Sequence, residues 1–191
     1  MVYVGFICEG QTEVEFLSSA NFINYLSDIG LSVTKIINAE GSANLLTHNI
    51  SPYIEILIKE RTEKIIILTD LDTDACITIT KQRINARPED VVIVAAREIE
   101  SWFLANTLAM RKILNSEDFY FEFPEKENKP FETVNQLLAK STGRGIGKKS
   151  AGKLKLISLL LNAGLDITQA AAHPNCPSAA YFLNKLNSLT P

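Results

Sequence analysis

The chain has 191 residues, of which 46% are apolar and 21% are charged. These values are typical of a globular protein that can bury a hydrophobic core without disulfide bonds or structural metals. The net charge of −3 excludes a uniformly basic nucleic-acid coat protein. Six of the 19 basic residues nevertheless lie within residues 140–155, which contain no acidic residue, so a local anion-binding surface remains possible.

In chain order, short apolar runs and stretches with helical spacing alternate over the first hundred residues. The apolar runs predict four strands, at residues 2–8, 33–37, 64–69 and 91–95. The helical spacing predicts intervening helices at residues 12–30, 43–61 and 74–86, and we expect Pro52 to kink or divide the second of these. Strands and helices that alternate in this way indicate an α/β fold, with a mostly parallel four-stranded sheet flanked by helices.

The rest of the sequence is mainly helical in pattern. Helices are predicted at residues 100–113, 131–140, 152–162 and 178–189, with an aromatic, turn-rich loop at 119–130. We therefore expect an α/β core over residues 1–106. We expect residues 107–191 to form a mostly helical extension packed on that core, with a basic loop at 140–155.

Acidic residues follow three of the four predicted strands. They are Glu9 after the first, Asp70 and Asp72 after the third, and Glu98 and Glu100 after the fourth. Ligands of open parallel sheets bind beyond the carboxyl ends of the strands, so we expect these acids to share one edge. Carboxylates that gather in this way resist ionisation unless a cation lies between them, and hard oxygen ligands suit Mg²⁺ or Mn²⁺. The alternative is that they are solvated residues at loop ends.

The same residues carry a resemblance to a known family. The segments Glu9–Glu13 (EGQTE) and Asp70–Asp72 (DLD), each after an apolar strand, resemble a TOPRIM domain. The likeness is to overcoming-lysogenization-defect nucleases and their small single-domain relatives. Glu98–Ala105 (EIESWFLA) is similar to a further signature of this group, and so is Pro174–Ser178 (PNCPS). The fold that this resemblance implies is TOPRIM-like and Rossmann-like.

The resemblance implies a metal-dependent phosphoryl-transfer site. Glu9 would be the general acid/base or a metal ligand, and the Asp70–Asp72 pair would bind Mg²⁺ or Mn²⁺. Glu100 and Glu98 would add further ligands. Gly10 and Glu13 would support the site from the start of the following helix. Asn106 departs from the motif, because relatives often carry Asp there.

Nucleic acid is the substrate class implied, and the basic loop supplies candidate phosphate ligands. These are Lys140, Arg144, Lys148, Lys149 and Lys153. A solvated loop is the competing interpretation. The stretch from Gly147 to Lys153 nearly matches a nucleotide-binding P-loop, but Leu154 replaces the required Ser or Thr and no strand precedes the glycines.

Three functions follow from these observations as alternatives. The first is a Mg²⁺- or Mn²⁺-dependent nuclease that cleaves DNA or RNA in bacterial phage defence or a mobile-element system, where a partner ATPase is implied by resemblance. The second is a non-catalytic metal- or nucleic-acid-binding subunit of an ATPase complex. The third is a haloacid dehalogenase-like phosphatase, suggested by Asp70–Thr73 (DLDT).

The cysteines and the hydropathy bear on the compartment. Cys8, Cys76 and Cys176 are far apart and lack CxxC spacing, which argues against a disulfide framework or a zinc ribbon. No segment has the length and hydrophobicity of a membrane span, and no secretory signal is recognisable. We expect a cytoplasmic protein without membrane association, and the sequence does not indicate an oligomeric state.

Overall fold

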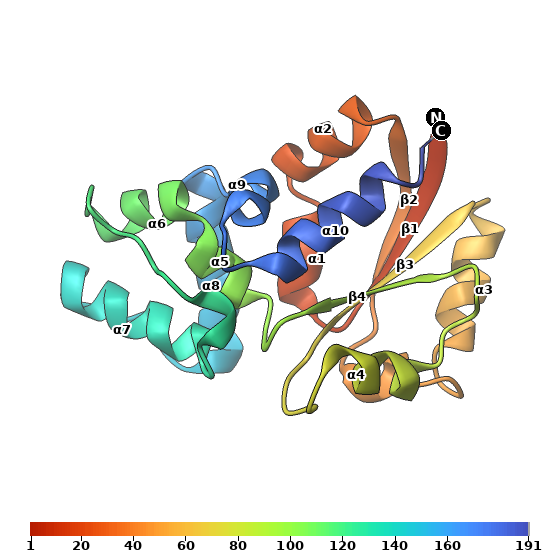
Figure 1. Cartoon of the computed structure of the whole chain (residues 1–191), viewed down its shortest axis with the longest axis horizontal. Helices are drawn as coiled ribbons and strands as arrows, with labels where there is room; N and C mark the ends of the chain where they lie inside the picture. The colour runs from red at the N-terminus through yellow and green to blue at the C-terminus, as the bar shows by residue number, and fades with distance from the viewer. Residues whose placement is uncertain (191) are drawn as a thin grey trace. The chain divides into compact units, whose positions relative to one another are not determined.

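The computed structural model describes residues 1–190, except for the side chain of residue 150 (Figure 1). The chain forms two compact units. The first contains residues 1–94 and the chain from residue 184 onward, and the second contains residues 95–183. The boundary expected after residue 106 remains a prediction about domain organisation.

A four-stranded parallel sheet forms the centre of the first unit. Its strands are β1 (Val2–Cys8), β2 (Leu31–Asn38), β3 (Lys64–Asp70) and β4 (Val91–Ala95). They lie in the order β2-β1-β3-β4. β1 therefore pairs on both sides, with Cys8 opposite Asn38 of β2 and Leu68 of β3. The predicted α/β class with a parallel sheet is confirmed.

Short helices connect the strands of this unit. They are α1 (Gln11–Leu17), α2 (Ala20–Asp28), the 3₁₀ turn η1 (Ser42–Leu45), α3 (Ser51–Lys59) and α4 (Ile77–Ile84). The single helix predicted over residues 12–30 is broken, because Ser19 caps α2 by accepting a hydrogen bond from the Phe22 N–H. Pro52 lies in the first turn of α3, where the absence of its N–H costs nothing, so it divides the segment as expected.

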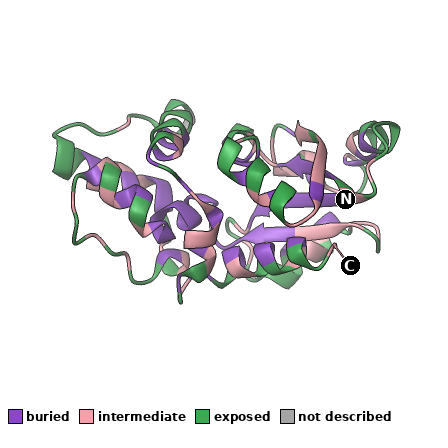
Figure 2. Ribbon diagram, turned by 90° about the horizontal axis from the view of Figure 1, so that it is seen from above, coloured by how far each residue is buried: buried purple, intermediate pink, exposed green. Residues whose placement is uncertain are grey.

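Alternate residues of β1 supply two opposite apolar layers. Phe6 contacts the ring of Phe22 in α2, with 6.0 Å between centroids. Ile7 belongs to the cluster that contains Ile54 and Leu57 of α3. Both side chains are fully buried. Figure 2 shows strand segments that are buried at the centre of the sheet and helices that are exposed on their outer faces. A sheet covered on both faces explains why its central strands β1 and β3 are mainly apolar, whereas the edge strand β2 is mostly of intermediate burial.

Helices make up the second unit. They are α5 (Glu100–Ala105), α6 (Thr107–Leu114), the 3₁₀ turn η2 (Pro124–Lys126), α7 (Pro130–Thr142), α8 (Lys149–Asn162), α9 (Ile167–Ala172) and most of α10 (Pro177–Asn187). The helix predicted over residues 100–113 is broken at Asn106, and α9 is an additional helix. Among the described residues, none of the helices is both long and apolar enough to cross a membrane.

The short helix α5 is buried on every side, so all six of its residues belong to the interior of the second unit. Its Trp102 stacks on Phe182 of α10, with 5.4 Å between ring centroids. Its Glu100 is equally inaccessible. A carboxylate in such a position requires an internal partner, because the cost of burying an unpaired charge is large.

Candidate functional site

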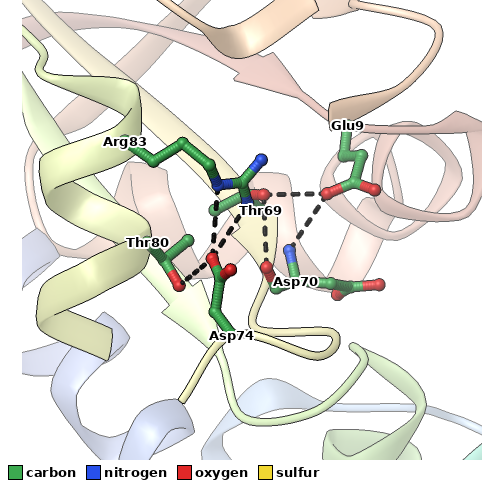
Figure 3. Close-up of polar contacts among 6 residues, drawn as sticks. All are labelled: Glu9, Thr69, Asp70, Asp74, Thr80 and Arg83. Atoms are coloured by element: carbon green, nitrogen blue, oxygen red, sulfur yellow. Dashed lines mark hydrogen bonds and ion pairs between the residues drawn. The ribbon is translucent and has the colours of Figure 1, made fainter. Parts of the chain in front are cut away.

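Two of the predicted acids meet at the carboxyl ends of neighbouring strands in the first unit. Glu9 directly follows β1, and Asp70 is the last residue of β3. One oxygen of Glu9, Oε2, accepts a hydrogen bond from the Thr69 hydroxyl at 2.8 Å and from the Asp70 backbone N–H at 3.3 Å (Figure 3). Parallel pairing of β1 with β3 thus brings together two residues that lie 61 positions apart.

Thr69 is a residue of this group that the sequence interpretation did not include. It is buried at the end of β3, where its hydroxyl has no access to water and bonds Glu9 instead. The hydrogen bond fixes one orientation of the Glu9 carboxylate. The signal in the sequence is a hydroxyl residue just before the first Asp of DLD, in a strand that is otherwise apolar.

Gly10 and Glu13 lie at the start of α1, directly after Glu9. Gly10 is the N-cap, in an extended conformation, and Glu13 is buried in the first turn. A Cβ atom at Gly10 would lie 3.2 Å from Oε2 of Glu13, so the glycine leaves room for that carboxylate. The negative charge of Glu13 is favourable at the positive end of the helix dipole. Burial, with a smaller contribution from Glu13, raises the pKa of the Cys8 thiol, which leaves it neutral.

Asp72 differs from Asp70 in its surroundings. It is exposed in the turn after β3 and has a left-handed backbone, with φ of 49°. Asp74, two residues on, ends the turn and accepts hydrogen bonds from the Thr80 hydroxyl at 2.8 Å and from two nitrogens of Arg83 (Figure 3). Asp74 therefore ties the turn to α4, a role that the sequence interpretation did not assign.

The other two predicted acids, Glu98 and Glu100, form ion pairs with lysines of the basic segment in the second unit. Lys149 Nζ lies 2.6 Å from Glu98 Oε1. Lys153 Nζ lies 3.2 Å from Glu98 Oε2 and 3.0 Å from Glu100 Oε1, and it donates a hydrogen bond to Glu100 Oε2 at 3.1 Å. The two ammonium groups therefore engage all four carboxylate oxygens.

The surroundings shift the two carboxyl groups in opposite directions. Burial raises the pKa of Glu98, but Lys149 and Lys153 more than offset this effect, so the pKa lies below its ordinary value. For Glu100, which is not exposed at all, burial outweighs Lys153 and raises the pKa to about 7. Partial desolvation lowers the pKa of Lys149, but its ion pair with Glu98 more than offsets this effect, so the pKa is raised. Both shifts favour the ionised forms of Glu98 and Lys149, so these two groups form a charged pair.

Four of the five predicted phosphate ligands are exposed, and Lys149 among them is paired with Glu98. Lys140 is in the last turn of α7, and Arg144 and Lys148 lie between α7 and α8. Asn135 shapes this connection, because its side chain accepts from the Ile146 N–H at 2.6 Å and donates to the Gly147 carbonyl at 3.3 Å. The other three exposed cations are available to an anionic ligand.

The glycines that resemble a P-loop have structural roles in the second unit. Gly147 has φ of 106°, a left-handed conformation that favours glycine. Gly152 lies in α8, where a Cβ atom would be 2.5 Å from Cζ of Phe131 in α7. Close packing of two helices therefore explains Gly152.

Two sequence signatures meet in the interior of the second unit. The Ser178 hydroxyl, from PNCPS, accepts hydrogen bonds from Trp102 Nε1 at 2.7 Å and from the Ala96 N–H at 3.2 Å. It donates to Glu125 at 2.6 Å, and the same carboxylate accepts from the Ser178 N–H. Ser178 thus bonds the backbone just before Glu98 and the Trp102 side chain just after it. Trp102 is 1% exposed, so it also packs in this interior.

Asn106 also has a structural role. It is fully buried and caps α6 by accepting from the Ala109 N–H, while its Nδ2 donates to the Asp166 carbonyl at 2.6 Å. An Asp carboxylate could not make the second bond. The departure from the TOPRIM-like motif is therefore matched to a local hydrogen-bond requirement.

The carboxylates offer pairs of oxygen donors within each unit. Over the described part of the chain, no three side chains from Asp, Glu, His and Cys form a ready metal site. Mg²⁺ is commonly bound through one or two carboxylates, with water completing its shell. Glu98 Oε2 and Glu100 Oε1 are buried, and the ammonium group of Lys153 lies 3.2 Å and 3.0 Å from them, so a cation already faces these oxygens. Carboxylate oxygens are the donor type that a hard divalent metal prefers.

The chain was compared with protein-family profiles, curated sequences and solved structures. No protein-family profile and no curated protein sequence matches the chain. The C-terminal region of the Burkholderia pseudomallei OLD protein is a solved structure similar to this chain, with 16% sequence identity and a TM-score of 0.42. The similarity covers 98% of this chain and 99% of that one.

Proposed function

We propose that the protein is a Mg²⁺- or Mn²⁺-dependent phosphoryl-transfer protein, acting as a nuclease on DNA or RNA phosphodiesters. The observation that carries the proposal is the junction of Glu9 and Asp70 at the carboxyl ends of β1 and β3, where one Glu9 oxygen is hydrogen-bonded to residues of β3. Ligand sites of parallel sheets lie at this edge. The resemblance of EGQTE and DLD to TOPRIM motifs points to the same residues.

The roles of the acids follow from their positions. Glu9 and Asp70 would hold the metal ion, together with Asp72, which is exposed in the adjoining turn. Glu100 and Glu98 are the further ligands that the motif resemblance implies. The bound ion would neutralise the scissile phosphate and lower the pKa of a water molecule. Glu9 is oriented by Thr69 to accept a proton from the attacking water or to remain a ligand.

The exposed cations of the second unit would hold the nucleic-acid backbone. Lys140, Arg144 and Lys148 lie on or near the connection between α7 and α8 and face solvent. Contacts of this type are independent of sequence and weaken as salt increases. A bacterial defence or mobile-element role, a partner ATPase and a cytoplasmic location are further parts of this proposal, and they rest on the sequence resemblance and composition alone.

The test compares cleavage by the wild-type protein and by Asp70→Asn. Each is incubated with single- and double-stranded DNA and RNA plus Mn²⁺ or Mg²⁺. Asp118→Asn, at an exposed position of the second unit, is the matched control. We expect metal-dependent cleavage that Asp70→Asn abolishes and Asp118→Asn preserves. Equal cleavage by all three proteins would identify a contaminating nuclease and contradict the proposal.

A second candidate is a non-catalytic nucleic-acid-binding subunit. The observation that favours it is the ion pairing of Glu98 and Glu100 with Lys149 and Lys153, which neutralises acids that the nuclease reading needs. Such a subunit would bind nucleic acid without metal-dependent cleavage. Its binding would weaken steeply with salt, and Lys148→Met would reduce that salt dependence. A phosphatase, in contrast, would hydrolyse a small phosphomonoester in the same preparations.

A further inference from the structure

Lys153 is placed like a coordinated cation. Its ammonium nitrogen lies within 3.2 Å of three carboxylate oxygens, two from Glu100 and one from Glu98. Lys149 takes the remaining oxygen of Glu98 at 2.6 Å. The two acids come from the segment that precedes and begins α5, and both lysines come from the start of α8. In a surface ion pair, each charged group usually has one charged partner. Here every oxygen of both carboxylates faces an ammonium group.

The position of the lysines on α8 shows what holds them there. Lys149 is the first residue of the helix, Lys153 lies one turn later, and the first turn contains no acid. Positive charge is unfavourable at a helix N-terminus, where the dipole is itself positive. The carboxylate of Glu98 supplies compensating negative charge. Glu98 is 9% exposed, so this charge is poorly screened by salt.

The sequence analysis gave these four residues two roles that exclude each other. Glu98 and Glu100 are expected metal ligands, whereas Lys149 and Lys153 are expected phosphate ligands. Neither pair can act while each neutralises the other. A divalent cation would change the balance, because it carries twice the charge of an ammonium group and approaches oxygen to about 2.0–2.2 Å.

We propose that Lys149 and Lys153 are resident counter-ions of Glu98 and Glu100, and that a divalent cation displaces them and frees both ammonium groups for phosphate. The inference rests on the proposed function in one respect, namely that the acids bind a metal. It adds an exchange of partners that couples metal binding to phosphate binding. Such coupling is reciprocal, so a phosphate ligand that captures the lysines would in turn raise the affinity for metal.

The test measures the reactivity of individual lysine amines in the wild-type protein, which ion pairing with a carboxylate lowers. An amine-acylating reagent is applied with and without saturating Mn²⁺, at equal ionic strength, and labelling is quantified for each lysine by mass spectrometry. We expect Mn²⁺ to increase the labelling of Lys149 and Lys153 severalfold. Lys155, exposed on the same helix, is the internal control and should not change. Unchanged labelling of Lys149 and Lys153 would overturn the inference.

A variant establishes that the effect passes through the acids. In Glu98→Gln, Lys149 loses its charged partner, so we expect it to be labelled readily without metal and to respond little to Mn²⁺. Glu117→Gln, at an exposed position, should behave as wild type. An undiminished Mn²⁺ response of Lys149 in Glu98→Gln would contradict the inference.

The outcomes separate this inference from the proposed function. Metal-dependent labelling without any nucleic-acid cleavage would support the partner exchange and count against the nuclease. Cleavage that requires Asp70, together with lysine labelling that ignores Mn²⁺, would support the nuclease and overturn the exchange.

Discussion

At the scale of single residues, the orientation of Glu9 depends on a neighbour that carries no charge. Thr69 is 1% exposed, and its hydroxyl donates to Glu9 Oε2 at 2.8 Å. The Asp70 N–H contacts the same oxygen at the longer distance of 3.3 Å. The Thr69 hydroxyl therefore makes the shorter of these two contacts. Thr69 is an uncharged strand residue, yet it orients the Glu9 carboxylate.

Thr69→Val tests this role, because it removes the hydroxyl and keeps the shape of the side chain. We expect turnover in the nuclease assay to fall about 10- to 100-fold, as for other residues that orient a metal ligand or base. The free energy of unfolding should change by only about 1 kcal/mol, since one hydrogen bond is lost. Thr69→Ser keeps the donor and should retain most activity. Full activity in Thr69→Val would show that Glu9 needs no such support.

His173 makes the stability of the second unit depend on pH. Its Nδ1 accepts a hydrogen bond from the Asn175 N–H at 3.1 Å, and its ring stacks on Tyr120. Burial lowers the pKa of His173 below the ordinary 6.5, although Phe121 and Glu125 act in the opposite direction. The native state therefore binds fewer protons than the unfolded state, so this stability is present above about pH 6.5 and is lost as the pH falls through the native pKa.

Urea denaturation of the wild-type protein and His173→Gln, at about pH 7.5 and about pH 5, checks this effect. The wild-type protein should lose more stability between the two pH values than His173→Gln, because glutamine does not titrate. His48→Gln, at an exposed position, is the control and should keep the wild-type dependence. An identical pH response in wild type and His173→Gln would show that His173 is not the group responsible.

At the scale of elements, α7 and α8 pack closely against each other at Gly152. In most exposed helices, Gly→Ala is stabilising by about 0.5–1 kcal/mol. At Gly152 the added methyl would lie 2.5 Å from the ring of Phe131, which is 2% exposed and cannot move freely. We therefore expect Gly152→Ala to destabilise the protein by about 1–3 kcal/mol in chemical denaturation.

A double-mutant cycle identifies the cause of that loss. Phe131→Leu alone should be destabilising, because it removes buried ring atoms. In the Gly152→Ala background, however, the smaller side chain makes room for the new methyl, so the two effects should be less than additive. Strict additivity would show that Phe131 is not the obstacle.

The sequence predicted strands better than helix ends, for a physical reason. Strands covered on both faces are rich in apolar residues, as β1 and β3 are, and all four strands were recognised near their observed positions. The breaks at Ser19 and Asn106 depend on side-chain caps, which leave no trace in apolar spacing. Helix α9 is only six residues long and buries mainly Ile167 and Ala170, so its pattern is too short to stand out.

The candidate site was also predicted only in part. Strand ends allowed Glu9 and Asp70 to be selected, because parallel topology brings such positions to one edge. The pairing of Glu98 with Lys149 joins residues 51 positions apart. It depends on how α8 packs in the second unit, and no spacing rule reports such packing. The roles of Thr69, Asp74 and Ser178 were missed because each forms one specific hydrogen bond or small network rather than a motif.

At the scale of the whole molecule, the first unit is completed from both ends of the chain. Residues from Asn184 onward belong to it together with residues 1–94. Asn187 Nδ2 donates to the Tyr25 hydroxyl at 3.0 Å, and Leu186 is 1% exposed. The last turn of α10 is therefore part of the interior that surrounds the sheet.

Leu186→Ala should consequently destabilise the first unit. We expect a loss of about 2–5 kcal/mol, the usual range for a buried leucine truncated to alanine. Hydrogen exchange should accelerate at amides of α2, the helix that carries Tyr25. Leu189→Ala, at a less buried position, is the matched control and should cost less. Equal protection of α2 amides in Leu186→Ala and wild type would show that the last turn of α10 is dispensable.

This arrangement has a consequence for the order in which the protein forms during synthesis. The ribosome makes the chain from its N-terminus, so β1 to β4 emerge well before residues 184–190. Residues 95–183, in contrast, make up the whole second unit and can close as soon as they have emerged. The sheet emerges before that segment, and its long-range parallel pairings form slowly. We therefore expect the first unit to be completed after the second, with the Leu186 side of its core open until residues 184–190 have emerged.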